Sequence, residues 1–210
     1  MSDEISVEKL GIIPTIRDGI NIGLKNIGPI LINVLLWALT AWIPYLNVGT
    51  TIGLAVGVIA KASKDEAIDF LEIFDPKYRK YMGEYFLTSG LVTIGVSAGI
   101  ALFIIPGIII CIAWSLAVLL VIDKGKNPTE AISLSNNLTY GYKGKMFGTY
   151  FLTGLAFSIV QIILGSIGTA SHNGFLMFFF GLIIFASALL EIFVFIGIQA
   201  SIYKQLAGDA

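Results

Sequence analysis

Glu191 is the residue whose type and position most suggest chemistry. It is the one charged residue inside a long apolar segment that resumes after it as far as Tyr203. A carboxylate at membrane depth costs at least about 2.5–3.5 kcal/mol on insertion scales, and no Lys or Arg stands nearby in this segment. Ser187 lies one helical turn away on the same face, and Gln161 belongs to the preceding apolar segment. These three residues form a candidate intramembrane polar site.

Two interpretations of this polar site stay open. In the first, Glu191 is a neutral acid that bridges two helices through a hydrogen bond. In the second, it couples the movement of an ion or a proton across the membrane. Both interpretations require the Glu191 side chain to face the interior of a helix bundle rather than lipid.

Other patterns that carry catalysis or ligand binding are missing from the sequence. It has no P-loop, nucleotide-binding glycine fingerprint, HExxH motif or nucleophile elbow. Its single cysteine, Cys111, and single histidine, His172, do not form a zinc cluster. We therefore expect no catalytic, cofactor-binding or metal-binding residues, and a protein that is not an enzyme. The net charge of −1 gives no basic excess for nucleic acid.

Charged residues gather between the apolar stretches. Acidic side chains recur at helical spacing, which favours a solvated helix face over a cation site; they are Asp65, Glu66, Asp69, Glu72 and Asp75. Basic residues at 77–80 and 143–145 stand beside the apolar stretches. There they would set the topology or contact anionic lipid headgroups.

The composition indicates a membrane protein. Of the 210 residues, 56 % are hydrophobic and 13 % are charged, and the mean hydropathy is +0.87. A soluble domain carries about 25 % charged residues, so the lipid bilayer is the natural solvent for this chain. The acidic start of the chain, Met1 to Glu4, lacks the positive region of a signal peptide. The first hydrophobic segment is therefore expected to remain in the mature protein.

Three stretches lack charged residues, namely 26–60, 85–122 and 146–190. A crossing needs about 20 residues, so each stretch has room for two crossings. Pro44, Pro106 and the glycine-containing segment 168–174 favour a reversal near the middle of each. The expected helical hairpins are 28–44 with 47–61, 84–104 with 107–122, and 147–168 with 175–203.

The basic residues indicate the topology. All thirteen Lys and Arg lie at the N-terminus, in 61–80, in 124–145, or at Lys204. In the hairpin arrangement they all fall on one side, which the positive-inside rule makes cytoplasmic. We therefore expect an all-α integral membrane protein with six transmembrane helices and both termini in the cytoplasm. The first hairpin allows only about 17 residues per crossing, the lower limit, so a re-entrant pair is its alternative.

The expected organisation is a single membrane domain, 1–210, in which short amphipathic helices precede the hairpins. Its parts are an N-terminal amphipathic helix 1–27, hairpin 28–61, a cytoplasmic helix in 62–83, hairpin 84–122, a cytoplasmic helix in 123–146, and hairpin 147–203.

An internal repeat accompanies this organisation. Residues 54–56 match 116–118 as Leu-Ala-Val, and residues 85–88 match 150–153 as Tyr-Phe-Leu-Thr. Ser63 with Glu66, and Asn127 with Glu130, both have the spacing of a capping box, which satisfies free amides at a helix start. We therefore expect equivalent cytoplasmic helices to begin at Ser63 and at Asn127.

A family resemblance lies between Ile105 and Gly141. The residues that carry it are Ile105, Pro106, Gly107, Trp114, Ser115, Leu116, Ala117, Asp123, Pro128, Glu130, Ala131, Ser135, Leu138, Thr139 and Gly141, followed by the ending 200–206. This part of the chain resembles the membrane domain attached to some glycerophosphoryl diester phosphodiesterases, and related multi-pass proteins. The resemblance implies a prokaryotic inner-membrane protein with about six helices. It implies no phosphodiesterase activity, because that chemistry belongs to a separate soluble domain.

Three classes of function are compatible with these observations. We expect first a membrane scaffold, an accessory subunit, or a module that organises lipid or protein. The alternative is a small transporter or channel with Glu191 in its polar path, and an intramembrane enzyme comes third. The expected partners are the lipid bilayer and a membrane protein or a second copy of the chain, without a cofactor and without nucleic acid.

Overall fold

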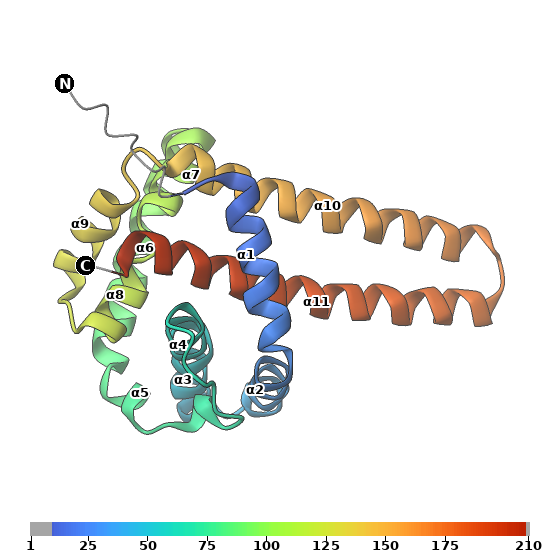
Figure 1. Cartoon of the computed structure of the whole chain (residues 1–210), viewed down its shortest axis with the longest axis horizontal. Coiled ribbons are helices and arrows are strands. Elements are labelled where there is room, and N and C mark those ends of the chain that lie inside the picture. Colours follow the sequence, from blue (N-terminus) through green and yellow to red (C-terminus); the bar gives the residue numbers. More distant parts are fainter. Residues whose placement is uncertain (1–9, 209–210) are drawn as a thin grey trace, which may run out of the picture.

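The computed structural model describes residues 10–208, and every regular element in that range is a helix (Figure 1). The elements are α1 (Ile12–Lys25), α2 (Ile27–Thr40), α3 (Pro44–Ile52), the π-helical turn η1 (Gly53–Val58), α4 (Ile59–Ser63), the 3-10 turn η2 (Glu72–Phe74), α5 (Lys77–Lys80), α6 (Met82–Leu102), α7 (Ile104–Ala113), α8 (Ala117–Lys124), α9 (Pro128–Leu138), α10 (Lys143–Ala170) and α11 (Gly174–Ala207).

Five helical segments in this range are long and apolar enough to cross a membrane. They are Pro44–Ser63, Met82–Leu102, Ile104–Lys124, Lys143–Ala170 and Gly174–Ala207. Helices α1 and α2 pass the same test as a pair, but they meet at a bend of 75°. Residues 10–208 therefore contain five such segments, or six if this bent pair is one span.

The first predicted crossing, 28–44, differs most from its expected form. Helix α2 has 14 residues, which corresponds to about 21 Å, whereas the hydrocarbon core is about 30 Å thick. The chain bends at Asn26, whose backbone N–H and side-chain amide both donate to the Ile22 carbonyl. Helix α2 alone is therefore too short to cross.

The first two reversals come slightly before the predicted positions, whereas the third, at 171–173, lies within its predicted segment 168–174. The first lies at 41–43 and the second at Phe103, which has an extended backbone. Pro44 begins α3, and Pro106 lies in the first turn of α7. A proline at a helix start loses no hydrogen bond, because the first N–H groups of a helix have no partner inside it. The prolines therefore begin the returning helices instead of occupying the turns.

Helix α1 packs tightly across α11. A Cβ atom added at Gly19 would lie 2.7 Å from the Ile198 Cα, and one added at Gly197 would overlap the Gly19 carbonyl oxygen. The Asp18 carboxylate accepts a hydrogen bond of 2.7 Å from the Ser201 hydroxyl. The N-terminal amphipathic helix α1 is thus held against α11 by direct backbone contact.

Helices α10 and α11 run side by side, and their outer halves project beyond the other helices (Figure 1). The other helices do not share this direction: α2 and α3 are seen nearly end-on in the same view. The Asn173 side chain caps α11 by accepting from the backbone N–H groups of Phe175 and Leu176. A parallel arrangement of three hairpins across one bilayer therefore stays a prediction.

The expected helix start at Ser63 is wrong. Ser63 is the last residue of α4, and its hydroxyl donates to the Ala60 carbonyl oxygen at 2.7 Å. The chain from 64 to 71 forms no regular helix. By contrast, the cap at Asn127 is confirmed, because its side chain accepts from the Glu130 N–H at 2.9 Å. Equivalent helices therefore do not begin at these two places.

Long-range hydrogen bonds explain why 62–83 is not one helix. The buried amide of Asn33 donates to the Asp69 carbonyl oxygen at 2.8 Å and accepts from the Ile73 N–H at 3.1 Å. Because these backbone groups bond to α2, they are not available to a local helix ladder. The side chain of Glu72 then turns inward.

Candidate functional site

Glu72 is the centre of a buried polar cluster. Its side chain is 2 % exposed and accepts hydrogen bonds from Lys61 Nζ at 2.6 Å, Tyr78 Oη at 2.6 Å and Lys77 Nζ at 3.1 Å. Lys77 also pairs with Asp75 at 2.9 Å. The predicted solvated acidic face is therefore wrong at Glu72, since this carboxylate is buried and paired.

The packing of Tyr78 depends on Gly57 in the π-helical turn η1. A Cβ atom at Gly57 would overlap the Tyr78 hydroxyl, and one at Gly53 would lie 2.6 Å from the Ile73 Cα. These glycines let the segment 72–78 lie directly on η1. Turns of this kind inside helices are often found at functional sites.

The three donors keep Glu72 ionised. Burial by itself raises the pKa of the Glu72 carboxyl, but hydrogen bonds from Lys61, Tyr78 and Lys77 outweigh burial and hold this pKa below its usual value. Burial acts to lower the pKa of Lys77, but hydrogen bonds to Asp75, Tyr78 and Glu72 raise it above the usual range. Burial and the neighbouring Glu72 carboxylate both raise the pKa of Tyr78. The cluster therefore holds a fixed set of charges at neutral pH.

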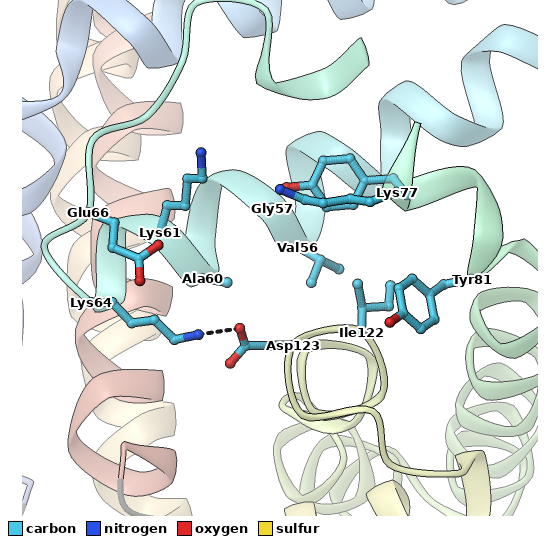
Figure 2. A pocket seen from close by; sticks show the side chains of 11 residues that line it. Val56, Gly57, Ala60, Lys61, Lys64, Glu66, Lys77, Tyr81, Ile122 and Asp123 are labelled. Atoms are coloured by element: carbon cyan, nitrogen blue, oxygen red, sulfur yellow. Dashed lines mark hydrogen bonds and ion pairs between the residues drawn. The ribbon is translucent and has the colours of Figure 1, made fainter. Parts of the chain in front are cut away.

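A cavity of about 210 Å³ lies beside this cluster, between η1, α4, α5 and α8 (Figure 2). Its charged and phenolic lining residues are Lys61, Lys64, Lys77, Tyr78, Tyr81, Glu66 and Asp123. Figure 2 shows Lys64 reaching from the end of α4 to Asp123 near the end of α8, and Glu66 standing beside Lys61. Both signs of charge therefore meet around the cavity.

Ion pairs and a hydrogen bond connect this region with both ends of the described chain. Asp65 pairs with Lys25 at 3.0 Å and with Lys204 at 3.1 Å. Asp123 pairs with Lys64 and accepts a hydrogen bond from the Tyr203 hydroxyl at 2.8 Å. The bonds of Asp65 and Asp123 join α1, α8 and α11 to the segment that follows α4.

This arrangement joins helix ends through paired charges. The ammonium groups of Lys61, Lys64 and Lys77 already face carboxylates. Within residues 10–208, no group of three or more His, Cys, Asp or Glu side chains could hold a metal ion. The ion pairs around the cavity connect the ends of several helices.

The structure brings two of the three residues of the predicted intramembrane site together. Gln161 Nε2 of α10 donates to Glu191 Oε2 of α11 at 3.0 Å, and both side chains are half-buried. Ser187 lines a hollow of about 530 Å³ between the same helices, otherwise lined by apolar side chains. Glu191 and Gln161 are not among the residues that line this hollow.

Several residues of the family-like motif stabilise a break between α7 and α8. At 114–116 the helix is interrupted, and Ser135 of α9 donates to the Ala113 carbonyl oxygen at 2.7 Å while accepting from the Leu116 N–H at 3.2 Å. Thr139 donates to the same carbonyl at 3.3 Å. Side chains of α9 thus satisfy backbone groups that the break frees.

The remaining residues of the family-like motif lie at helix ends or at contacts between helices. Trp114 lies against Gly95, where a Cβ atom would overlap the indole ring, and Gly107 lies against the Ile100 backbone. Pro128 follows the cap at Asn127, and Glu130 pairs with Lys126 at 3.0 Å. Gly141 has φ +81°, a conformation that favours glycine. Together with Pro106 and Asp123 described above, these residues shape helix ends and contacts.

The sequence reasoning missed the Glu72 cluster. The available signal was the sequence Leu71-Glu72-Ile73-Phe74, in which a single acid stands among large apolar residues. Because Glu72 recurs at helical spacing with four other acidic residues, it was assigned to the same solvated face. No protein-family model, curated protein or solved structure matches this chain.

Proposed function

We propose that this chain is a non-catalytic multi-pass membrane protein that organises lipid or a partner protein within the bilayer. The observation that carries the proposal is the apolar surface of the projecting α10–α11 pair. Phe175 is 74 % exposed, Ile162 67 % and Phe178 66 %. Continuous exposed apolar surface of this kind is typical of membrane or protein contact.

The polar residues support an organising role rather than a reactive one. Within the described chain, no buried side-chain polar atom is without a hydrogen-bond partner. The charged groups of Lys61, Glu72 and Lys77 bind one another instead of facing an open site. Such networks give rigidity when every member is satisfied.

The proposed topology is three hairpins with their basic ends in the cytoplasm. It is supported by the ion pairs that Asp65 makes with Lys25 and Lys204, and that Lys64 makes with Asp123. These residues come from segments that the hairpin arrangement assigns to one side. An inner-membrane protein of prokaryotes, as the resemblance implies, would have this orientation.

Transport through a polar path at Glu191 is the alternative function. The hydrogen bond between Gln161 and Glu191 fits the interpretation of a helix-bridging acid. The hollow beside them is lined by Ser187 and seven apolar residues. These observations favour the organising role over an ion path.

A flux measurement separates the two functions. The purified chain is reconstituted into liposomes that contain a pH-sensitive dye, and a proton or potassium gradient is applied. We expect the wild type and Glu191→Gln to show the same flux as empty liposomes. A flux present in the wild type and lost in Glu191→Gln would establish the transport alternative, because glutamine keeps the hydrogen bond but cannot ionise.

A further inference from the structure

We propose that a groove between α1, α10 and α11 holds one acyl chain of an anionic phospholipid, and that Arg17 binds the lipid phosphate. This inference rests on the proposed function, because it names the lipid that a membrane-embedded chain would organise. It concerns a different part of the molecule from the polar cavity of Figure 2.

The groove consists of two adjoining apolar hollows. One, of about 530 Å³, lies between α10 and α11; the other, of about 320 Å³, lies between these helices and α1. Ala156, Phe157 and Leu190 line both hollows, so they are continuous. Each volume is within the range of about 300–1,000 Å³ that is common for ligand pockets.

The length of the groove suits an acyl chain. Along α10 its lining residues extend from Leu152 to Leu164, a distance of about 18 Å at 1.5 Å per residue. One leaflet contributes half of a hydrocarbon core that is about 30 Å thick. A chain seated in the groove would therefore extend through roughly one leaflet.

Arg17 lies beside the α1 end of the groove. It lines a polar hollow of about 350 Å³ with Asp18 and Asn21, next to the helix face that carries Ile16 and Ile20. Arg17 is exposed and makes no hydrogen bond or ion pair with another described residue. Its guanidinium group offers planar paired donors that match a phosphate.

A lipid chain fits this groove better than a partner helix does. Packed helix axes are about 8–10 Å apart, so the groove between α10 and α11 is narrower than a whole helix, which is about 10 Å wide. A partner helix would therefore enter the groove only with its side chains. A flexible hydrocarbon chain would fill it along its length, and the exposed Arg17, which pairs with no other described residue, would select an anionic headgroup.

The test is native mass spectrometry of the detergent-purified chain titrated with phosphatidylglycerol or phosphatidylcholine. We expect the wild type to bind one phosphatidylglycerol in preference to phosphatidylcholine. Ala156→Trp fills the groove and should weaken binding about tenfold, which is the effect of excluding about two methylene groups. Its matched control is Ser158→Trp, the same gain in size on an exposed part of α10 outside the groove.

The headgroup contact has its own pair of variants. Arg17→Gln should remove the preference for phosphatidylglycerol while phosphatidylcholine still binds. The control, Arg79→Gln, removes the same charge from an exposed residue outside the groove and should keep the preference. Melting temperatures of all variants, measured in the same detergent, identify any variant that fails to fold.

Three results would overturn the inference. The first is equal weakening by Ala156→Trp and Ser158→Trp, which would show that lipids only coat the surface. The second is an unchanged headgroup preference in Arg17→Gln. The third is a change in the oligomeric state of Ala156→Trp, which would show that another protein chain covers the groove. Proton flux in the liposome experiment would instead reject the proposed function and leave the lipid result standing.

Discussion

Glu72 is held as a buried carboxylate by two lysines and a tyrosine. Lys61, Lys77 and Tyr78 together supply charge and hydrogen bonds, so the carboxyl is more stable ionised than protonated. Without this carboxylate the buried Tyr78 hydroxyl would lack its acceptor, which costs about 1–3 kcal/mol. Lys61 and Lys77 are 26 % and 46 % exposed, so water can solvate their charges. This residue therefore offers the sharpest test of the polar cluster.

We expect Glu72→Ala to lower the free energy of unfolding by about 1–3 kcal/mol, the cost of leaving the buried Tyr78 hydroxyl without its acceptor. In this variant Lys61 and Tyr78 lose their acceptor. Glu66→Ala is the control, and it should change the free energy of unfolding by less than about 0.5 kcal/mol, since Glu66 is exposed. The measurement is thermal or denaturant unfolding in detergent, followed by circular dichroism. Similar values for the two variants would show that Glu72 is not part of a stabilising cluster.

The pH dependence of stability follows from the same contacts. The pKa of Glu72 is lower in the folded protein than its ordinary value of 4.5. Its stabilisation is therefore fully present above that value and is lost as the pH falls through the folded pKa. The wild type should lose melting temperature below about pH 4.5, and Glu72→Gln should lose less over the same range.

At the scale of elements, the crossing of α1 over α11 depends on glycine. Gly19 and Gly23 of α1 meet the backbone of α11 around Gly197, without room for a side-chain atom. Close approach of this kind is the usual role of small residues between membrane helices. The bend at Asn26 then turns the chain away from α11 into α2.

We expect Gly197→Ala to destabilise the protein by about 1–3 kcal/mol, the usual cost of overpacking. Gly181→Ala on the same helix is the matched control, because a Cβ atom there meets nothing within 4 Å. Melting temperatures in detergent compare the two variants. Equal values would contradict direct backbone contact between α1 and α11.

At the scale of the whole molecule, ion pairs join Lys25 and Lys204 to Asp65, and Lys64 to Asp123. The outer halves of α10 and α11 project beyond the other helices (Figure 1). The reversals at 41–43 and 171–173 contain no Lys or Arg. In the proposed topology these two reversals face the outside of the cell. This assignment can be tested without knowing the function.

Cysteine labelling checks the topology in a Cys111→Ser background. Ala41→Cys and His172→Cys should react with an impermeant thiol reagent in intact cells. Lys80→Cys should react only after the membrane is permeabilised. Labelling of Lys80→Cys in intact cells would contradict the proposed orientation, and protection of Ala41→Cys alone would indicate a re-entrant first hairpin.

The sequence by itself determined the features that depend on neighbouring residues. Apolar stretches predicted helices long enough for a membrane, and the Asn127 cap is confirmed, because hydrophobic length and capping act over a few residues. Gln161 and Glu191 were also singled out from the sequence, as polar residues inside apolar segments.

Only the tertiary structure decided the features that join distant segments. Ser63 was expected to start a helix. Instead, the side chain of Asn33 binds the backbone of Asp69 and of Ile73, which lie 36 and 40 residues further along the chain. Glu72 resembled its acidic neighbours until Lys61 and Tyr78 were brought to it. Local patterns reveal a residue's periodicity, whereas burial and charge pairing depend on which remote segments pack together.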